Sequence, residues 1–165
     1  MVQRVLTDDT VYCIDTSALI NLWREPYAPD IFPGIRKDIE GLVRDGRLVA
    51  PSHVYAELEV RDDDLHDWAK AHKRMFRRLD EDDLWKVSRI LRQFPTLIDA
   101  GKDTEDADPF LIALAMDRGW CVVTSERSGG ARGRPRIPNV CRHFGLRCIG
   151  LMDLFREQGW RYDRG

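Results

Sequence analysis

The sequence lacks a long hydrophobic run, and this absence excludes a protein that crosses a membrane with helices. No apolar stretch in the 165 residues reaches the roughly 18 residues that a membrane-spanning helix needs. The first ten residues, MVQRVLTDDT, also lack the apolar segment of a secretory signal peptide. We therefore expect a protein that has no contact with the membrane and that works in the cytoplasm.

Closely spaced cysteine and histidine ligands are also missing. The four cysteines include no Cys-x-x-Cys pair, and the four histidines do not have the spacing of zinc ligands. Because two of the cysteines lie inside apolar runs, we predict buried free thiols. A partial zinc site of Cys141, His143 and Cys148 is the weaker alternative.

A large excess of charge of either sign is absent too, since the formal net charge is −2. The protein is therefore not a polycation that coats nucleic acid. Its charges are distributed unevenly: residues 127–136 carry four arginines and no acid, whereas residues 80–83 and 103–108 are strongly acidic. An arginine loop beside an acidic cluster suits a metal-dependent enzyme that acts on phosphates, and a solvated flexible loop is the alternative explanation.

Size and composition indicate one globular domain over residues 1–165. Hydrophobic residues make up 43% of the chain and charged residues 33%, which is ordinary for a folded domain. Short apolar runs at 10–15, 47–51, 120–126 and 146–150 are typical of strands. Helical spacing appears at 17–25, 33–46, 52–60, 109–119 and 151–159, with Ser52 as an expected N-cap, and a helical insertion is expected at about 62–95.

Strands that alternate with helices, each strand apolar throughout, predict a parallel sheet covered on both faces. We therefore expect a three-layer α/β/α sandwich with a short, mostly parallel central sheet of Rossmann type. In such a sheet, ligands bind outside the carboxyl ends of the strands. The residues that follow the strands are therefore the candidates for a functional site.

Four acids from separate elements are expected at that edge of the sheet. Asp15 ends the first strand, Glu126 follows the apolar run 120–124, and Asp108 opens an apolar helix. Glu57 lies in the helix after the second strand, on the side nearer its apolar face. Two carboxylates about 4 Å apart repel by roughly 4 kcal/mol at an effective dielectric constant of about 20, so protonation or a cation must compensate the cluster.

Carboxylate ligands without histidine or cysteine suit Mg²⁺ or Mn²⁺ rather than zinc. Helix capping is the simpler explanation for two of the acids. Asp15 precedes a helix, and Asp108 precedes Pro109, which is a usual arrangement of an N-cap followed by Pro at N1. Capping and metal binding are compatible at Asp108, whereas Asp103, Glu105 and Asp106 are expected to be loop acids that tune the field around it.

Four stretches in order, YCIDTSALI, APSHVYAELE, DADPFLIALAMDRGWCVVTSE and CIGLMDLF, resemble the PIN-domain superfamily of metal-dependent ribonucleases, which includes the VapC toxins. The resemblance spans nearly the whole chain. The interval from Asp108 to Gly119 to Thr124 agrees with the usual spacing of that superfamily, and it selects Asp108 over Asp106 and Glu105.

The resemblance implies an endoribonuclease that acts as the toxin of a type II toxin-antitoxin pair and that uses Mg²⁺ or Mn²⁺. The implied catalytic and metal-binding residues are Asp15, Glu57, Asp108 and Glu126, and the implied supporting hydroxyls are those of Thr16, Ser17 and Thr124. Two features depart from the superfamily pattern. The last acid is Glu rather than the commoner Asp, and the arginine loop after it is longer.

The expected partners follow from the same reasoning. The arginines expected to hold RNA phosphates are Arg127, Arg132, Arg134 and Arg136. The resemblance also implies a cognate antitoxin, expected to have a helix-turn-helix domain, and a homodimer or hetero-oligomer. The aromatic residues Trp68, Phe76 and Trp85 are expected to pack in the core, with an oligomer or antitoxin surface as the alternative.

Two other functions remain open at this point. A non-catalytic PIN-like module would bind RNA or protein with acids that are only structural. A phosphatase would use Asp15 as a nucleophile after the first strand, in the manner of haloacid-dehalogenase-like enzymes. Those enzymes have a second Asp two residues later, where this chain has Ser17.

Overall fold

The structure is a computed structural model that describes residues 9–24, 31–61, 63–98, 106–129 and 134–162. Asp103, Glu105 and Arg132, which the sequence analysis singled out, lie outside the described residues. The elements in chain order are β1 (Tyr12–Ile14), α1 (Thr16–Leu22), α2 (Pro33–Arg44), β2 (Leu48–Pro51), α3 (Ser52–Glu59), α4 (Asp64–Ala71), η2 (Lys73–Met75), β3 (Phe76–Arg77), α5 (Glu81–Gln93), η3 (Pro95–Leu97), α6 (Asp108–Ala115), β4 (Cys121–Val123), α7 (Ile137–His143), β5 (Cys148–Ile149) and α8 (Leu151–Glu157).

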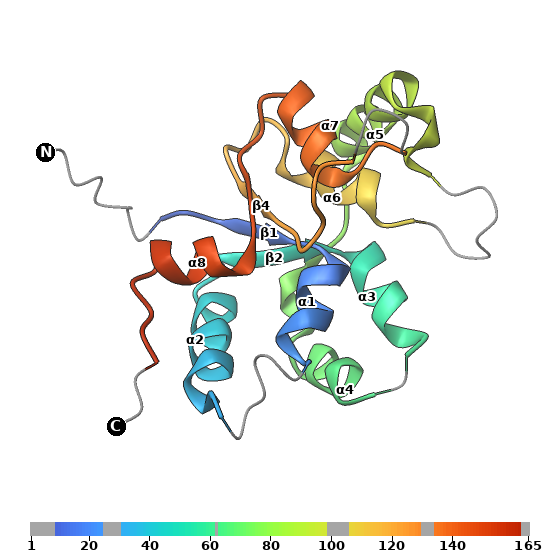
Figure 1. Cartoon of the computed structure of the whole chain (residues 1–165). Helices are drawn as coiled ribbons and strands as arrows, with labels where there is room; N and C mark the ends of the chain where they lie inside the picture. Colours follow the sequence, from blue (N-terminus) through green and yellow to red (C-terminus); the bar gives the residue numbers. More distant parts are fainter. Residues whose placement is uncertain (1–8, 25–30, 62, 99–105, 130–133, 163–165) are drawn as a thin grey trace, which may run out of the picture.

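The five strands form one parallel sheet with the order β3-β2-β1-β4-β5 (Figure 1). The chain builds the sheet outward from β1 through β2 to β3, and it then crosses to the other side of β1 to form β4 and β5. The direction of growth therefore reverses between β1 and β4. In open parallel sheets this switch point is where the carboxyl ends of two adjacent strands leave room for a ligand.

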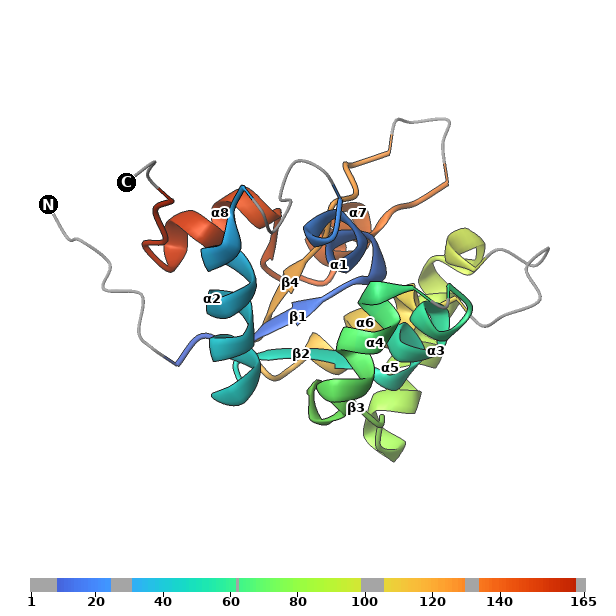
Figure 2. The same cartoon turned by 90° about the horizontal axis from the view of Figure 1, so that it is seen from below.

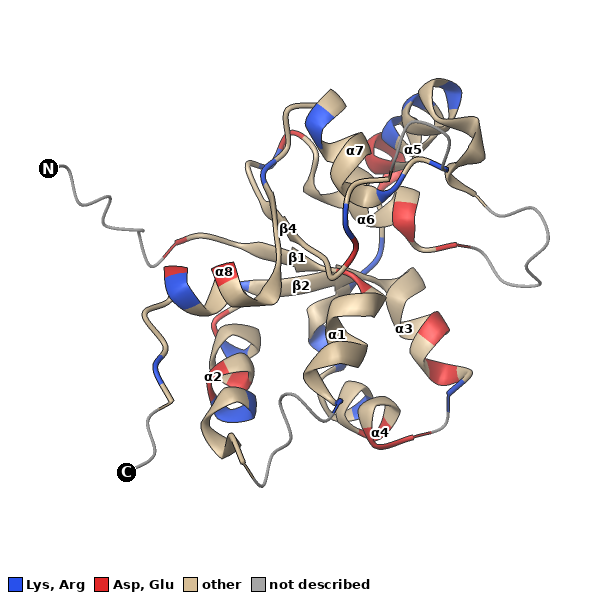
Figure 3. Cartoon of the chain, in the orientation of Figure 1, with Lys and Arg blue, Asp and Glu red and all other residues tan. Residues whose placement is uncertain are grey.

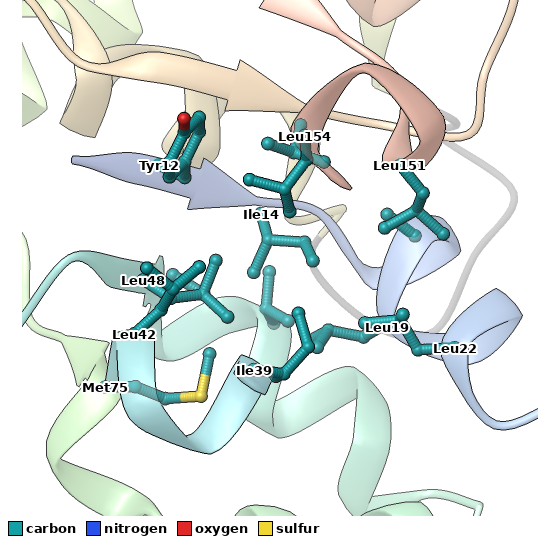
Figure 4. Packing of buried hydrophobic residues seen from close by; sticks show 14 of the residues in the cluster. Tyr12, Ile14, Leu19, Leu22, Ile39, Leu42, Leu48, Met75, Leu151 and Leu154 are labelled. Carbon is teal, nitrogen blue, oxygen red and sulfur yellow. The ribbon is translucent and has the colours of Figure 1, made fainter. Parts of the chain in front are cut away.

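Alternate residues of each central strand face opposite sides of the sheet, and both sides are buried. In β1, Tyr12 and Ile14 join one hydrophobic cluster, whereas Cys13 joins the other. Figure 4 shows Tyr12 and Ile14 near side chains of α1, α2 and α8. The prediction of free thiols is confirmed, since all four cysteines are free and three are buried.

Helices cover both faces of the sheet (Figures 1 and 2). One cluster contains residues of α1, α2, α3, α4 and α8, and the other contains residues of α5, α6 and α7. The predicted fold class, a three-layer α/β/α sandwich with a short parallel sheet, is therefore confirmed. Among the described residues, no helix is both long enough and apolar enough to cross a membrane.

The region 62–95 is not entirely helical, contrary to the sequence analysis. Phe76 and Arg77 form β3, which pairs with Ala50 and Pro51 at the edge of the sheet. A two-residue strand carries no periodic pattern that a sequence analysis can detect. Ser52 is also not an N-cap, because Pro51 holds the cap position and Ser52 is already helical.

A candidate metal centre at the carboxyl ends of the strands

Asp15 follows β1 at the switch point and is almost fully buried, with 3% of its surface exposed. Its Oδ1 accepts a hydrogen bond from the Ala18 backbone N–H at 2.8 Å, so Asp15 is the N-cap of α1, which was the alternative to a functional role. Its Oδ2 accepts a hydrogen bond from the Thr124 hydroxyl at 2.5 Å. Burial raises the pKa of Asp15 to about 6, although these hydrogen bonds oppose the shift.

Two predicted supporting hydroxyls contact Asp15, and the third does not. The Ser17 hydroxyl lies 2.9 and 2.8 Å from the two carboxylate oxygens of Asp15. It also accepts a hydrogen bond from the Ser125 backbone, and the Thr124 hydroxyl accepts one from the Glu126 backbone. The buried hydroxyl of Thr16 makes no hydrogen bond within the described part of the chain. Ser17 and Thr124 therefore join the ends of β1 and β4, as a supporting role requires.

Glu57 and Glu126 each join two elements through one carboxylate oxygen. Oε1 of Glu57, in α3, accepts a hydrogen bond at 2.8 Å from the backbone of Ala107, the residue before α6. Oε2 of Glu126 accepts one at 3.0 Å from the backbone of Ile137, the first residue of α7. The longer Glu side chain at position 126 thus reaches the start of α7. The second oxygen of each acid has no hydrogen bond to any described residue.

Asp106 lies in the loop before α6, and its charge raises the pKa of Asp108, as expected of a loop acid that tunes the field around Asp108. Its exposed fraction is only 8%, and its Oδ1 lies 3.4 Å from the backbone nitrogen of Asp108. The sequence offered one signal, since an Asp side chain often bonds to the backbone two residues later. That signal did not indicate that Asp106 is buried, because its burial depends on the tertiary packing.

Asp108 is the acid whose position capping does not explain. Helix α6 begins at Asp108, and the N-cap position is held by Ala107. The prediction that Asp108 is the N-cap is therefore wrong. Within the described residues, its half-buried carboxyl group accepts no hydrogen bond. Burial raises its pKa to about 8, and the charges of Asp106, Glu126, Asp15 and Glu57, in decreasing order, add to the rise. Four other acids are therefore within electrostatic reach of Asp108.

The donor set suits a hard cation, but the side chains do not enclose one as they lie. In the described part of the chain, no three Asp, Glu, His or Cys side chains are grouped as metal ligands. Three of the acids each turn one oxygen toward a backbone N–H. The oxygens left over on Glu57 and Glu126, together with the carboxylate of Asp108, are chemically appropriate ligands for Mg²⁺ or Mn²⁺.

A cavity of about 460 Å³ adjoins the acids, and we refer to it as the arginine cavity. Arg127 and Arg136 line it, as the prediction of phosphate-binding arginines requires, beside Ser17 and Glu126. Arg24, which follows α1, also lines this cavity, although it was not among the predicted phosphate-binding arginines. In Figure 3 an acidic segment is directly followed by a basic one in the chain beyond β4. Acidic and cationic groups thus meet at the switch point.

The arginine loop does not act as one unit. Arg134 turns away from this cavity and donates a hydrogen bond from Nε to the carbonyl oxygen of Thr96, after α5, at 3.1 Å. The Asn139 side chain in α7 accepts hydrogen bonds from the backbone of Gly129 and of Arg136, which fixes the two described ends of the loop. Of the loop arginines that the structure describes, Arg127 and Arg136 line the cavity beside Glu126.

A second cavity, of about 590 Å³, lies on the other side of Glu126, between β4, β5 and the start of α8. We refer to it as the α8 cavity. It shares Asn21, Ser125, Glu126 and Arg127 with the arginine cavity. The two cavities therefore adjoin, and both border the acid cluster.

Comparison with known proteins gives a family and no activity. The model of the family described as "Domain of unknown function (DUF4411)" matches residues 12–162, and the chain belongs to this family. No curated protein matches the sequence. The crystal structure of PAE2754 from Pyrobaculum aerophilum is similar, with a TM-score of 0.46 and 15% sequence identity, over 92% of this chain and 98% of that chain.

Proposed function

We propose that this member of the DUF4411 family is an endoribonuclease that depends on Mg²⁺ or Mn²⁺. The observation that supports the proposal best is the carboxyl group of Asp108, which lies among four other acids without a hydrogen bond to any described residue. A purely structural acid would have a cap or an ion pair to offset its burial. An acid without either is suited to bind a cation.

The residues that would hold the metal are Asp15, Glu57, Asp108 and Glu126, and Asp106 adds negative charge beside them. When bound, the metal would lower the pKa of a coordinated water and neutralise charge on the phosphodiester. Burial and then the neighbouring acids raise the pKa of Asp108 to about 8, so binding of a metal at neutral pH would require this carboxyl group to lose its proton.

The protein's own groups orient the site and the substrate. Thr124 and Ser17 fix the carboxylate of Asp15 with hydrogen bonds from two elements. Glu57 joins α3 to the start of α6, and Glu126 joins the segment after β4 to the start of α7. The guanidinium groups of the arginine cavity provide donors for phosphate oxygens. This arrangement combines a rigid set of acids with cations for the substrate.

The phosphatase alternative has weaker support. Both carboxylate oxygens of Asp15 accept hydrogen bonds, Oδ1 from the Ala18 backbone and Oδ2 from Thr124. Such bonds stabilise the carboxylate and lower its reactivity as a nucleophile. Asp15 is therefore better suited to a role as a fixed ligand than to attack on phosphorus.

The resemblance to PIN-domain ribonucleases supports RNA as the substrate. We also propose that the protein acts in the cytoplasm as the toxin of a type II toxin-antitoxin pair. Its partners would be a cognate antitoxin with a helix-turn-helix domain and a second copy of the chain. Acids and arginines lie side by side in the site, so an antitoxin could bind there by pairing with groups of both charges.

Cleavage of RNA by the metal-free protein after addition of MnCl₂ tests the proposal. We expect wild-type protein to cut a mixed single-stranded RNA pool with Mn²⁺ and to be inactive with EDTA. Asp15→Asn should fold, because the Asn side chain still caps α1, and it should be inactive. Equal cleavage by this variant, or cleavage in EDTA, would contradict the proposal. Binding of RNA without cleavage under any divalent ion would favour the binding module.

A further inference from the structure

We infer that the α8 cavity is the subsite for the nucleotide next to the cleaved phosphodiester, with Asn21 reading its base and the arginine cavity holding the neighbouring phosphates. This inference rests on the proposed function and assigns the path of the RNA strand through the site. It adds Arg24, Asn21 and Arg156 to the residues that contact the substrate.

The arginine cavity requires an anion for electrostatic reasons. Arg24, Arg127 and Arg136 converge on it from α1 and from the two ends of the loop between β4 and α7. Within the described residues, none of the three side chains has an ion pair. The carboxylate that lines the same cavity, Glu126, already accepts a hydrogen bond from the start of α7. Converging cations repel one another, and a phosphate chain would relieve that repulsion through bidentate contacts.

The α8 cavity has the size and the walls for a nucleoside. Its volume of about 590 Å³ lies within the roughly 300–1,000 Å³ that small-molecule sites usually have. Its apolar wall comes from Pro138, Ile149, Leu151 and Met152, of which Met152 is 49% exposed. An unstacked base in single-stranded RNA needs such a surface for its faces, whereas a base inside a duplex could not enter.

Two arginines line the α8 cavity, and one of them is already partly neutralised by an acid. Arg156 lines the cavity and pairs with Asp153 at 3.3 Å, and both side chains are mostly exposed. Arg127, shared with the arginine cavity, has no such partner among the described residues. The excess of positive charge is therefore on the side of the arginine cavity. Phosphates are expected there, and the neutral base is expected on the side of α8.

Asn21 stands where the two cavities meet and is suited to read a base. It lies in the last turn of α1 and lines both cavities. Within the described residues its side-chain amide makes no hydrogen bond, so a donor and an acceptor remain available in one plane. An Asn amide pairs with the adenine edge that offers one acceptor and one donor. We therefore expect a preference for adenine at this position.

The first experiment measures how RNA affinity depends on salt, using the full-length protein with the Asp15→Asn substitution to prevent cleavage. Each contact with a phosphate contributes about −0.7 to the slope of log affinity against log salt for a single strand. Arg24→Ala should reduce the magnitude of the slope by about 0.7. The matched control is Arg44→Ala, an exposed arginine in α2 that lines a different cavity, and it should leave the slope unchanged. Equal slopes for the two variants would overturn the assignment of Arg24.

The second experiment maps the bases that flank the cut in a random single-stranded RNA pool. One flanking position should favour adenine by about tenfold, within the range of one bidentate base contact. Asn21→Ala should remove the preference at that position and leave the preferences at the other flanking positions as they are in the wild type. A preference that survives in Asn21→Ala, or that is lost equally at every position, would overturn the role of Asn21.

The third experiment uses Cys148, which lines the α8 cavity, as a reporter that does not depend on cleavage. The other three cysteines are buried. N-ethylmaleimide should therefore label Cys148 first, and a single-stranded adenine-rich RNA oligonucleotide should slow the labelling about tenfold at saturation. Unchanged labelling with RNA bound would overturn the subsite. Protection by free adenosine monophosphate as strong as that by RNA would also overturn it, in favour of a mononucleotide site.

These readouts separate the subsite from the proposed function. If RNA protects Cys148 and the Arg24→Ala slope changes, but no RNA is cut with any divalent ion, the proposed nuclease activity fails and the strand path holds. If RNA is cut but neither the slope nor the labelling responds, the strand path fails and the nuclease activity holds.

Discussion

Helix α6 has an acidic cluster at each end, and the two clusters are opposite in character. Beyond its carboxyl end, Arg118 donates hydrogen bonds to both oxygens of Asp83 at 2.6 and 3.1 Å, and Lys86 lies 3.5 Å away. At its start, Asp108 lies among Asp15, Glu57, Asp106 and Glu126 with no hydrogen bond to a described residue. One cluster is neutralised within the chain, and the other is not.

The direction of the pKa shifts expresses this difference. Burial alone would raise the pKa of Asp83, but the hydrogen bonds and the charge of Arg118 lower it. At Asp108 burial and the neighbouring charges act in the same direction and raise the pKa to about 8. Both groups of acids are partly withdrawn from water, so burial by itself does not identify a functional site. A buried acid without a compensating cation does indicate a functional site, because the folded protein then has excess negative charge that a bound cation can neutralise.

The largest expected effect is on activity. Asp108→Asn should lower RNA cleavage about a thousandfold or more, because a metal held by this site supplies several kcal/mol of transition-state stabilisation. Asp83→Asn should leave the rate per folded molecule unchanged. Cleavage rates normalised to the folded fraction check both expectations, and equal losses in the two variants would remove the distinction between the clusters.

The second expected effect is a loss of stability when the cluster of Asp83, Arg118 and Lys86 is disrupted. Asp83→Asn should lower the free energy of unfolding by about 3 kcal/mol, since it leaves Arg118 without its main partner. Urea denaturation at pH 7 would measure the change. A loss well below 1 kcal/mol would show that the Asp83 cluster is no more than a surface ion pair.

The third expected effect is a gain in stability, which Asp108→Asn should produce in metal-free protein. A carboxyl group whose pKa rises on folding binds protons more tightly in the folded state, so its contribution to stability falls as the pH rises from about 4 to about 8. In metal-free protein, Asp108→Asn should therefore raise the free energy of unfolding, and by more at pH 8 than at pH 5. At pH 5 the carboxyl group of folded wild-type protein is mostly protonated, so the substitution should have a smaller effect. Stabilisation that is equal at both pH values would indicate a cause other than ionisation.

The sequence was sufficient to predict much of the fold and part of the site. Short apolar runs between amphipathic segments predicted the parallel sheet, because a strand buried on both faces has no polar alternation. Asp15 directly follows β1, and Glu126 lies three residues after the end of β4. Predicting that both acids lie at the switch point therefore required only the order of the elements. Predicting the position of the two acids in helices, Glu57 and Asp108, also required the assumption that α3 and α6 begin at that same edge of the sheet.

The remaining features depend on tertiary packing. Asp106 is buried, yet its local sequence does not differ from that of the acids before it. Arg24 follows an apolar helix with no local signal for a ligand contact. It lines a cavity because residues 125–127 and Arg136 lie beside the end of α1. The seven-residue helix α7 was missed because it is too short to show periodicity beyond two turns.

Titration of metal-free protein with Mn²⁺, followed by the loss of the electron paramagnetic resonance signal of free Mn²⁺, tests the central claim most directly. Wild-type protein at pH 8 should bind Mn²⁺ stoichiometrically, and Asp83→Asn should bind it with the same affinity. Asp108→Asn should bind more than about tenfold more weakly, since even outer partners of metal ligands alter affinity by about 10- to 100-fold. Equal Mn²⁺ affinity in wild-type and Asp108→Asn protein, or no binding by the wild type, would contradict the account.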